Sequence, residues 1–174
     1  MNYSFVLALD PSGSYHEGKG TTGWSVYNCL DKNIIHGGSI PAASFNFMEA
    51  YWDEHIRIIA SFDTKYHKKF VVVIEDYLLY ANKAESQINS HMETCKLIGV
   101  IQHYCWTHQI PYVMQCASEV KLRWSNEILL YKKIVSRKEK KYYIPVNKKP
   151  IDRHCLDSIR HGIHYATFKN ETKR

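Results

Sequence analysis

The spacing of hydrophobic residues changes along the chain and predicts alternating strands and helices. Short apolar or alternating runs bounded by turn residues predict strands, whereas apolar positions that recur every three or four residues predict helices. The predicted strands are Ser4–Asp10, Gly23–Leu30, Asn33–Ile40, Phe70–Ile74 and Ile110–Met114. The predicted helices are Phe47–Tyr66, Ile88–Cys105, a stretch from Ser118 whose end the pattern leaves undefined, and Asp152–Thr167.

The order of these elements indicates an α/β fold. Three successive strands joined by short turns predict an antiparallel meander, and the strand–helix–strand order that follows predicts parallel pairing. The run FVVVI at Phe70–Ile74 is apolar at every position, which is typical of a central strand covered on both faces. We therefore expect a single domain over residues 1–174. It would contain a mixed five-stranded sheet, with three antiparallel strands followed by two parallel ones and helices on both faces.

The composition is that of a folded protein, with 45% hydrophobic and 23% charged residues. No apolar run approaches the roughly 20 residues of a membrane-spanning helix, and the N-terminus lacks the pattern of a secretory signal. We expect a soluble cytoplasmic protein with no membrane partner. The five cysteines are scattered without a CxxC pair, which favours reduced thiols over a zinc ribbon or a disulfide framework.

The positive charge is concentrated in one segment. Residues 121–149 contain ten lysines and arginines against two glutamates, a net charge of +8, within a chain whose total is +6. Such clustering is typical of a surface that binds a polyphosphate such as a nucleic acid. A solvated, partly mobile loop would have the same composition.

Acidic residues fall at the ends of two predicted strands. Asp10 closes the first strand and Glu75 follows Phe70–Ile74. If these strands are parallel neighbours, their carboxylates meet at one edge of the sheet. Carboxylates that share a site repel each other unless a cation lies between them, and Mg²⁺ prefers oxygen ligands.

The last predicted helix adds further polar side chains. At about 100° per residue, His154, Asp157 and His161 lie within an arc of roughly 60°, opposite an apolar stripe. A plain amphipathic helix with a wet face would show the same stripe. Together with Asp10 and Glu75, however, the stripe indicates the acidic ligand set of a two-metal phosphodiesterase.

Four motifs in order resemble the RuvC-type Holliday junction resolvases, a family of RNase H-like nucleases. The motifs are LALDPSG…TGWSV, VVVIEDYLLY, ETCKLIGVIQHYCWTHQIPYVMQCASEVK and HCLDSIRHGIHYA. The resemblance extends from Val6 to Ala166 and implies an RNase H-like fold. The abundance of Tyr, Lys, Asn and Ile suggests a phage-encoded member that acts in a bacterial host cell.

The resemblance implies a set of site residues. Asp10, Glu75, His154 and Asp157 would bind two Mg²⁺ ions, with Mn²⁺ as a substitute, and no organic cofactor is implied. Lys121 matches a basic residue near the family's active site. Candidate DNA-binding residues are Lys121, Arg123, Lys132, Lys133, Tyr77, Leu78 and Tyr80.

The implied activity is endonucleolytic cleavage of branched DNA. A homodimer would nick a four-way junction at paired sites, leaving 5′-phosphate and 3′-hydroxyl ends. The apolar residues of the predicted helix Ile88–Cys105 fit either the core or the dimer interface.

Departures from the family pattern leave alternatives open. The turn after Asp10 is longer than usual, and it either reaches DNA or forms a floppy insertion. Leu78 occupies the position of an aromatic wedge, so Tyr77 and Tyr80 would either stack on bases or pack at the strand end. Lys132 and Lys133 match a second basic residue equally well.

Three other functions remain on the sequence alone. One is an RNase H-like nuclease or processing factor that acts on RNA or RNA–DNA hybrids, and another is a non-catalytic junction-binding protein. The third is an actin-like phosphotransferase, suggested by the GTTG turn at residues 20–23, although 174 residues hold only one of the two domains that it needs.

Overall fold

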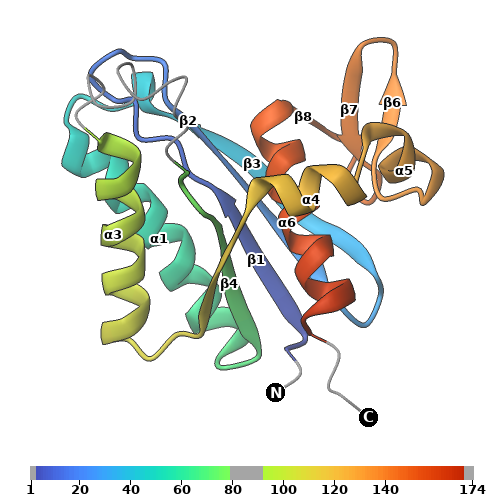
Figure 1. Ribbon diagram of the computed structural model, residues 1–174, viewed down its shortest axis with the longest axis horizontal. Helices are drawn as coiled ribbons and strands as arrows, with labels where there is room; N and C mark the ends of the chain where they lie inside the picture. Colours follow the sequence, from blue (N-terminus) through green and yellow to red (C-terminus); the bar gives the residue numbers. More distant parts are fainter. Residues whose placement is uncertain (1–2, 79–91, 171–174) are drawn as a thin grey trace.

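A mixed five-stranded sheet forms the centre of the molecule in the computed structural model, which describes residues 3–78 and 92–170 (Figure 1). Its spatial order is β3-β2-β1-β4-β5. The strands are β1 (Phe5–Asp10), β2 (Thr21–Asn28), β3 (Asn33–Pro41), β4 (Phe70–Glu75) and β5 (Tyr112–Gln115). The first three pair antiparallel, whereas β4 runs parallel to β1 and β5. This arrangement confirms the predicted sheet.

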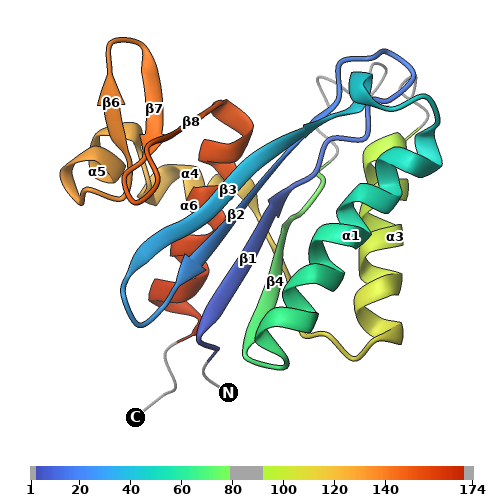
Figure 2. The same ribbon diagram turned by 180° about the vertical axis from the view of Figure 1, so that it is seen from behind.

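Helices cover both faces of the sheet, as Figure 2 shows from behind. Helices α1 (Met48–Tyr66) and α3 (Glu93–Thr107) lie on one face, and α4 (Ala117–Arg123) and α6 (Arg153–Phe168) lie on the other. A short 3₁₀ turn, Ala42–Ser44, links β3 to α1.

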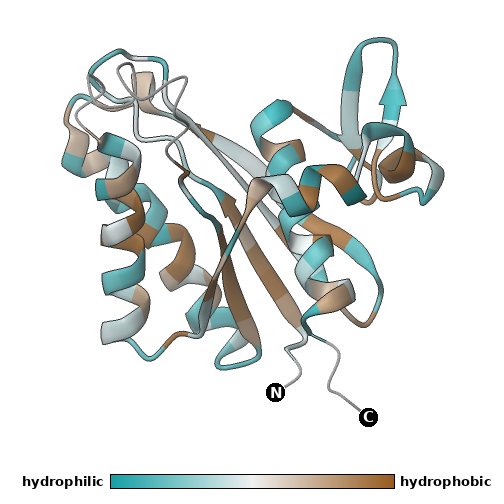
Figure 3. Cartoon of the chain, in the orientation of Figure 1, coloured by the Kyte–Doolittle hydropathy of each residue, from teal (hydrophilic) through white to brown (hydrophobic). Residues whose placement is uncertain are grey.

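Successive side chains of β1 and β4 point into two separate cores. Leu7 and Val72 pack with residues of α1 and α3, whereas Val6 and Val71 pack with residues of α4 and α6. Because both faces of these strands are buried, their sequences are apolar at nearly every position, as the brown strands in Figure 3 show.

The basic segment adds structure that the sequence pattern did not predict. It contains helix α5 (Asn126–Tyr131) and a separate three-stranded sheet of β6 (Ser136–Lys138), β7 (Lys141–Ile144) and β8 (Lys149–Ile151). The fully buried Ile144 packs this unit onto the core beneath α6. The interpretation of the segment as a mobile loop is therefore wrong for this part of the chain.

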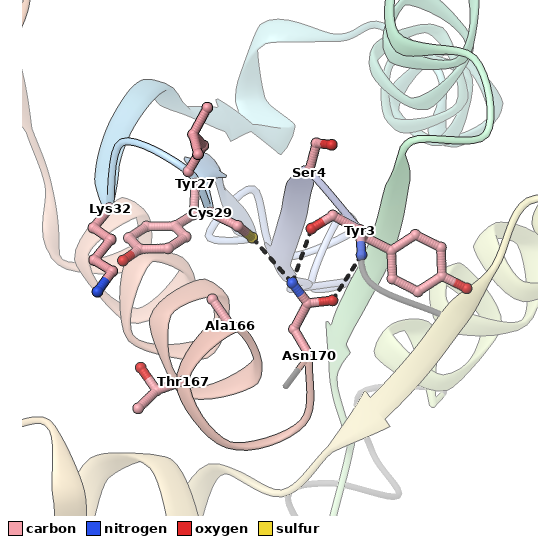
Figure 4. A pocket seen from close by; sticks show the side chains of 9 residues that line it. Tyr3, Ser4, Tyr27, Cys29, Lys32, Ala166, Thr167 and Asn170 are labelled. Atoms are coloured by element: carbon pink, nitrogen blue, oxygen red, sulfur yellow. Dashed lines mark hydrogen bonds between the residues drawn. The ribbon is translucent and has the colours of Figure 1, made fainter. Parts of the chain in front are cut away.

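The two ends of the described chain are tied together at the edge of the sheet opposite the ends of β1 and β4. The Asn170 side chain accepts a hydrogen bond from the Tyr3 backbone N–H at 2.8 Å and donates one to the Tyr3 carbonyl oxygen at 2.8 Å (Figure 4). Its amide also donates to the Cys29 thiol sulfur at 3.4 Å.

Among the helices of residues 3–78 and 92–170, none has the length and apolar character needed to span a bilayer.

Candidate active site

Asp10 and Glu75 lie at the carboxyl ends of adjacent parallel strands, as predicted. The register pairs Leu9 with Ile74, so the residue that follows each of them emerges at the same edge. Burial raises the pKa of Asp10 to about 6; His154 opposes this rise, and the carboxylates of Glu75 and Asp157 add to it. The edge therefore concentrates negative charge in a partly desolvated place.

A glycine allows α6 to reach this edge. Gly23 of β2 pairs with Asp10, and a Cβ atom at Gly23 would collide with the backbone of His154 and Cys155. Only a residue without a side chain lets the first turn of α6 lie directly on β2. The Thr-Gly motif thus sets the distance between the helix and Asp10.

His154 faces Asp10 from that first turn. Its Nδ1 atom lies 3.6 Å from Asp10 Oδ2, and its Nε2 atom accepts a hydrogen bond from Arg153 Nε at 3.3 Å. Because Arg153 can only donate, the neutral ring carries its hydrogen on Nδ1, directed at the carboxylate. The hydrogen bond with Asp10 raises the pKa of His154 despite partial burial.

Glu75 is held by a histidine that the sequence analysis left without a role. His161 Nε2 donates a hydrogen bond to Glu75 Oε2 at 2.8 Å, and the His161 side chain is fully buried. Burial raises the pKa of Glu75, but the hydrogen bond and charge of His161, with Lys121 and Asp10, outweigh it and leave the pKa lowered. His161 belongs to the polar stripe of HCLDSIRH together with His154 and Asp157, but the helical pattern could not show which part of the protein this stripe faces.

Asp157 is paired with two cations. It forms an ion pair with Arg160 one turn later on α6, and its Oδ2 atom lies 3.5 Å from Lys121 Nζ. Arg160 also donates to the Trp124 carbonyl oxygen at 2.8 Å and to the Asn126 side chain, which fixes its position. Arg160 is a second residue that the sequence analysis did not identify.

Lys121 lies within the electrostatic reach of all three carboxylates. Burial lowers its pKa, but the charges of Glu75, Asp157 and Asp10 outweigh this effect, so the pKa is raised. The structure thus brings Lys121 together with the acids, as the resemblance implied.

Each of the three acids also has a protein partner of its own. Asp10 contacts His154, Glu75 contacts His161, and Asp157 contacts Arg160. Across residues 3–78 and 92–170, no three His, Cys, Asp or Glu side chains are arranged closely enough to surround a metal ion.

The loop after Asp10 is tied to the body of the molecule. The buried Glu93, at the start of α3, accepts a hydrogen bond from the Tyr15 N–H at 2.7 Å and pairs with the His16 ring. A Cβ atom on Gly13 would collide with the backbone of Glu93, so loop and helix are in direct contact. A floppy insertion does not describe this loop.

The other candidate DNA-binding residues are dispersed. Arg123 stacks on the Phe168 ring at 4.9 Å from its centroid, and Lys132 and Lys133 are exposed on the turn after α5. Tyr77 packs against the core beside α1 and α3, and Leu78 is 37% exposed. The remaining candidate, Tyr80, lies outside the described residues.

Solved structures match the chain over nearly its whole length. Neither a protein-family model nor a curated protein sequence matches it. RuvC of T. thermophilus in complex with a Holliday junction substrate matches with a TM-score of 0.62 at 15% identity, covering 97% of this chain and 98% of that one. A second Thermus thermophilus RuvC structure matches with a TM-score of 0.60 at 15% identity, covering 93% of each chain. The chain therefore has a RuvC-like fold of the RNase H-like class, as its motifs predicted.

Proposed function

We propose that this protein is a metal-dependent, structure-specific endodeoxyribonuclease that resolves four-way DNA junctions. One observation carries the proposal: Asp10, Glu75 and Asp157 come from three separate elements and interact electrostatically at one sheet edge, beside Lys121. The RuvC-like fold, together with the Holliday junction substrate held by one of its structural neighbours, favours branched DNA over other polyphosphates.

The donor groups fit magnesium. Three carboxylates supply the hard oxygen ligands that Mg²⁺ prefers, and His154 supplies a nitrogen next to Asp10. Burial raises the pKa of Asp10, repulsion from Glu75 and Asp157 adds to this rise, and a divalent cation would relieve the repulsion. When bound, a pair of Mg²⁺ or Mn²⁺ ions activates water and stabilises the leaving oxygen of a phosphodiester.

The chain's own residues have distinct roles in this proposal. Asp10, Glu75 and Asp157 hold the ions, and His161 orients Glu75 through its hydrogen bond. Lys121 neutralises charge on the phosphate, because its ammonium group lies beside the acids and is half-exposed. His154 either adds a ligand or orients the phosphate. The products would carry 5′-phosphate and 3′-hydroxyl ends.

We also propose a homodimer, so that two sites cut one junction. A shallow, largely apolar groove of about 690 Å³ lies between α1 and α3 and is lined in part by Trp52, Ile56, Val100 and Tyr104. A second copy of the chain would bury these side chains. Light scattering at micromolar concentration should give twice the monomer mass, and Val100→Glu should give the monomer mass.

The deciding experiment is a cleavage assay with Mg²⁺ and with Mn²⁺. Labelled four-way junction, three-way junction, flap, linear duplex and RNA–DNA hybrid are compared. We expect paired nicks in the four-way junction, lost in Asp10→Asn, Glu75→Gln and Asp157→Asn proteins that remain folded. Full activity in any one variant would remove that residue from the site.

The substrate panel separates the alternatives. Equal cleavage of several branched DNAs would replace the resolvase with a less selective branched-DNA nuclease. Cleavage of the hybrid alone would indicate an RNA-processing enzyme. Tight junction binding without cleavage in either metal would leave a non-catalytic junction-binding protein.

A further inference from the structure

A groove connects the candidate active site with the small β6–β7–β8 sheet. It has a volume of about 440 Å³, and its lining includes Asp157 on α6 and Lys140, Lys141 and Tyr142 at the β6–β7 turn. Arg153, at the start of α6, also lines it. A chain-like ligand that reaches the acids can therefore continue along this groove without leaving the surface.

The groove is rich in unpaired positive charge. Throughout residues 3–78 and 92–170, no carboxylate oxygen lies within 4.0 Å of the side-chain nitrogens of Lys140, Lys141 or Arg153. Asp152 also lines the groove, but its carboxylate caps the N-terminus of α6 by accepting a hydrogen bond from the Cys155 N–H at 2.9 Å. The cations at the β6–β7 turn are thus available to an anionic ligand.

The lysines stand on an anchored support rather than a loose loop. Ile144 at the end of β7 is fully buried, and Lys149 Nζ donates a hydrogen bond to the Gly37 carbonyl oxygen of β3 at 2.9 Å. Arg137 of β6 lies over the Tyr142 ring at 5.6 Å, which stiffens the hairpin. Figure 1 shows this unit projecting beside the start of α6, and Figure 3 shows that the residues of its β6–β7 hairpin are mostly hydrophilic.

We propose that this groove binds the sugar-phosphate backbone of the DNA arm that leaves the active site, with Lys140 and Lys141 as its phosphate contacts. This inference rests on the proposed nuclease function. Lysine ammonium groups are flexible point charges, so they suit contacts that follow the backbone without reading the bases. The groove would hold the arm in register while the scissile phosphate lies at the acids.

The test is equilibrium binding without divalent metal, so that the DNA stays intact. Wild type is compared with a Lys140→Ala, Lys141→Ala double variant on a four-way junction and on a linear duplex over a range of salt concentrations. Each phosphate contact adds about 0.9 to the slope of log K against log salt. We expect the slope to become shallower by about 2 and binding at low salt to weaken about tenfold, for both DNAs.

A matched control removes two charges from the opposite edge of the sheet. Lys69 and Lys169 are exposed next to β4 and α6 at that edge, so Lys69→Ala, Lys169→Ala should keep the wild-type slope. Lys140→Arg, Lys141→Arg should also keep it, because positive charge remains.

The outcomes separate this inference from the function on which it rests. Wild-type affinity and slope in a folded Lys140→Ala, Lys141→Ala protein would overturn the groove while leaving the nuclease intact. An equal loss of DNA affinity in the Lys69→Ala, Lys169→Ala control would show that the effect comes from net charge alone, and this would also overturn the proposed groove. If the alanine variant fails to fold, loss of binding in a folded Lys140→Arg, Lys141→Arg protein would count against the groove, and retention would support it. A wild type that binds no DNA would remove the proposed function itself.

Discussion

His161 on α6 donates a hydrogen bond from Nε2 to Glu75 Oε2 at 2.8 Å, joining a fully buried imidazole to the carboxylate at the end of β4. The bond fixes one of the two Glu75 carboxylate oxygens. Groups that orient a metal-binding side chain commonly determine activity as strongly as some ligands do. The last helix therefore both contributes Asp157 to the candidate site and sets the orientation of Glu75.

Removing this imidazole should slow cleavage without preventing DNA binding. We expect His161→Ala to lower the cleavage rate by about 10–100-fold and to raise the Mg²⁺ concentration needed for half-maximal activity. His161→Gln should recover part of the loss, because its amide can donate a hydrogen bond in place of the ring. The measurement is the single-turnover rate on a four-way junction over a magnesium titration.

His164→Ala is the matched control for this prediction. His164 is also buried on α6, but it contacts the Phe168 ring, and within the described part of the chain it forms no hydrogen bond or ion pair with the three acids. Its removal should affect stability and leave the rate per folded molecule near that of wild type. Equal rates for His161→Ala and wild type would show that Glu75 needs no such support.

Gly23→Ala should disrupt the active site by moving α6. The added methyl group would occupy the space of the His154 backbone, so the first turn of α6 must shift away from Asp10. We expect a loss of cleavage of at least about 100-fold, together with a destabilisation of about 1–3 kcal/mol from overpacking. Cleavage rates and urea unfolding measure the two effects.

Gly162→Ala provides the comparison at the same helix–sheet interface. Its added methyl group would meet the Ala8 side chain at 3.4 Å, an ordinary contact distance. This variant should keep most of its activity. Similar behaviour of the two alanine variants would mean that the close approach at Gly23 has no special role.

The convergence of Asp10 and Glu75 could be predicted because a strand-end rule determines it. Parallel neighbouring strands bring their carboxyl ends to one edge, whatever the sequence between them. The same applies to Asp152 at the start of the last helix, where aspartate is a favoured N-cap residue: its side chain accepts a hydrogen bond from the Cys155 N–H. These features depend on local patterns and on topology alone.

The β6–β7–β8 sheet could not be predicted, because its strands are short and polar. Strand β6 has three residues, all exposed, and a few apolar anchors such as Ile144 hold the unit in place. The direction in which the His161 side chain points could not be predicted for a related reason. Helical periodicity puts it on a polar stripe, but whether that stripe meets solvent or the sheet edge depends on the packing of α6.

One substitution should remove the contacts between Glu93 and the loop after Asp10. Glu93→Ala takes away the acceptor for the Tyr15 N–H and the partner of the His16 ring, so the loop should open more often. We expect faster tryptic cleavage after the exposed Lys19, by about tenfold, with little change at other sites. Thr94→Ser, which keeps the hydroxyl that accepts from the Gly13 N–H, should retain the wild-type rate. An unchanged cleavage rate after Lys19 in Glu93→Ala would show that Glu93 does not hold the loop in place.

Acid should weaken the fold through His55, a buried ring behind this loop. His55 Nδ1 lies 2.7 Å from the Tyr51 carbonyl oxygen and Nε2 lies 2.8 Å from Thr22 Oγ1, so the neutral ring donates from Nδ1 and accepts at Nε2. Burial lowers its pKa to about 4 from an ordinary value of 6.5. Above pH 6.5 the ring is neutral in both states. Between pH 6.5 and 4 the His55 ring is protonated in the unfolded chain but stays neutral in the folded protein, so the free energy of unfolding falls by up to about 3 kcal/mol.

The comparison with His55→Gln separates this effect from that of Asp10. Asp10, with its pKa raised to about 6, changes stability in the opposite direction, and it is present in both wild type and His55→Gln. The difference in unfolding free energy between these two proteins should therefore shrink as the pH is lowered from 7 to 4.5 in urea titrations, and a constant difference would exclude His55 as the source.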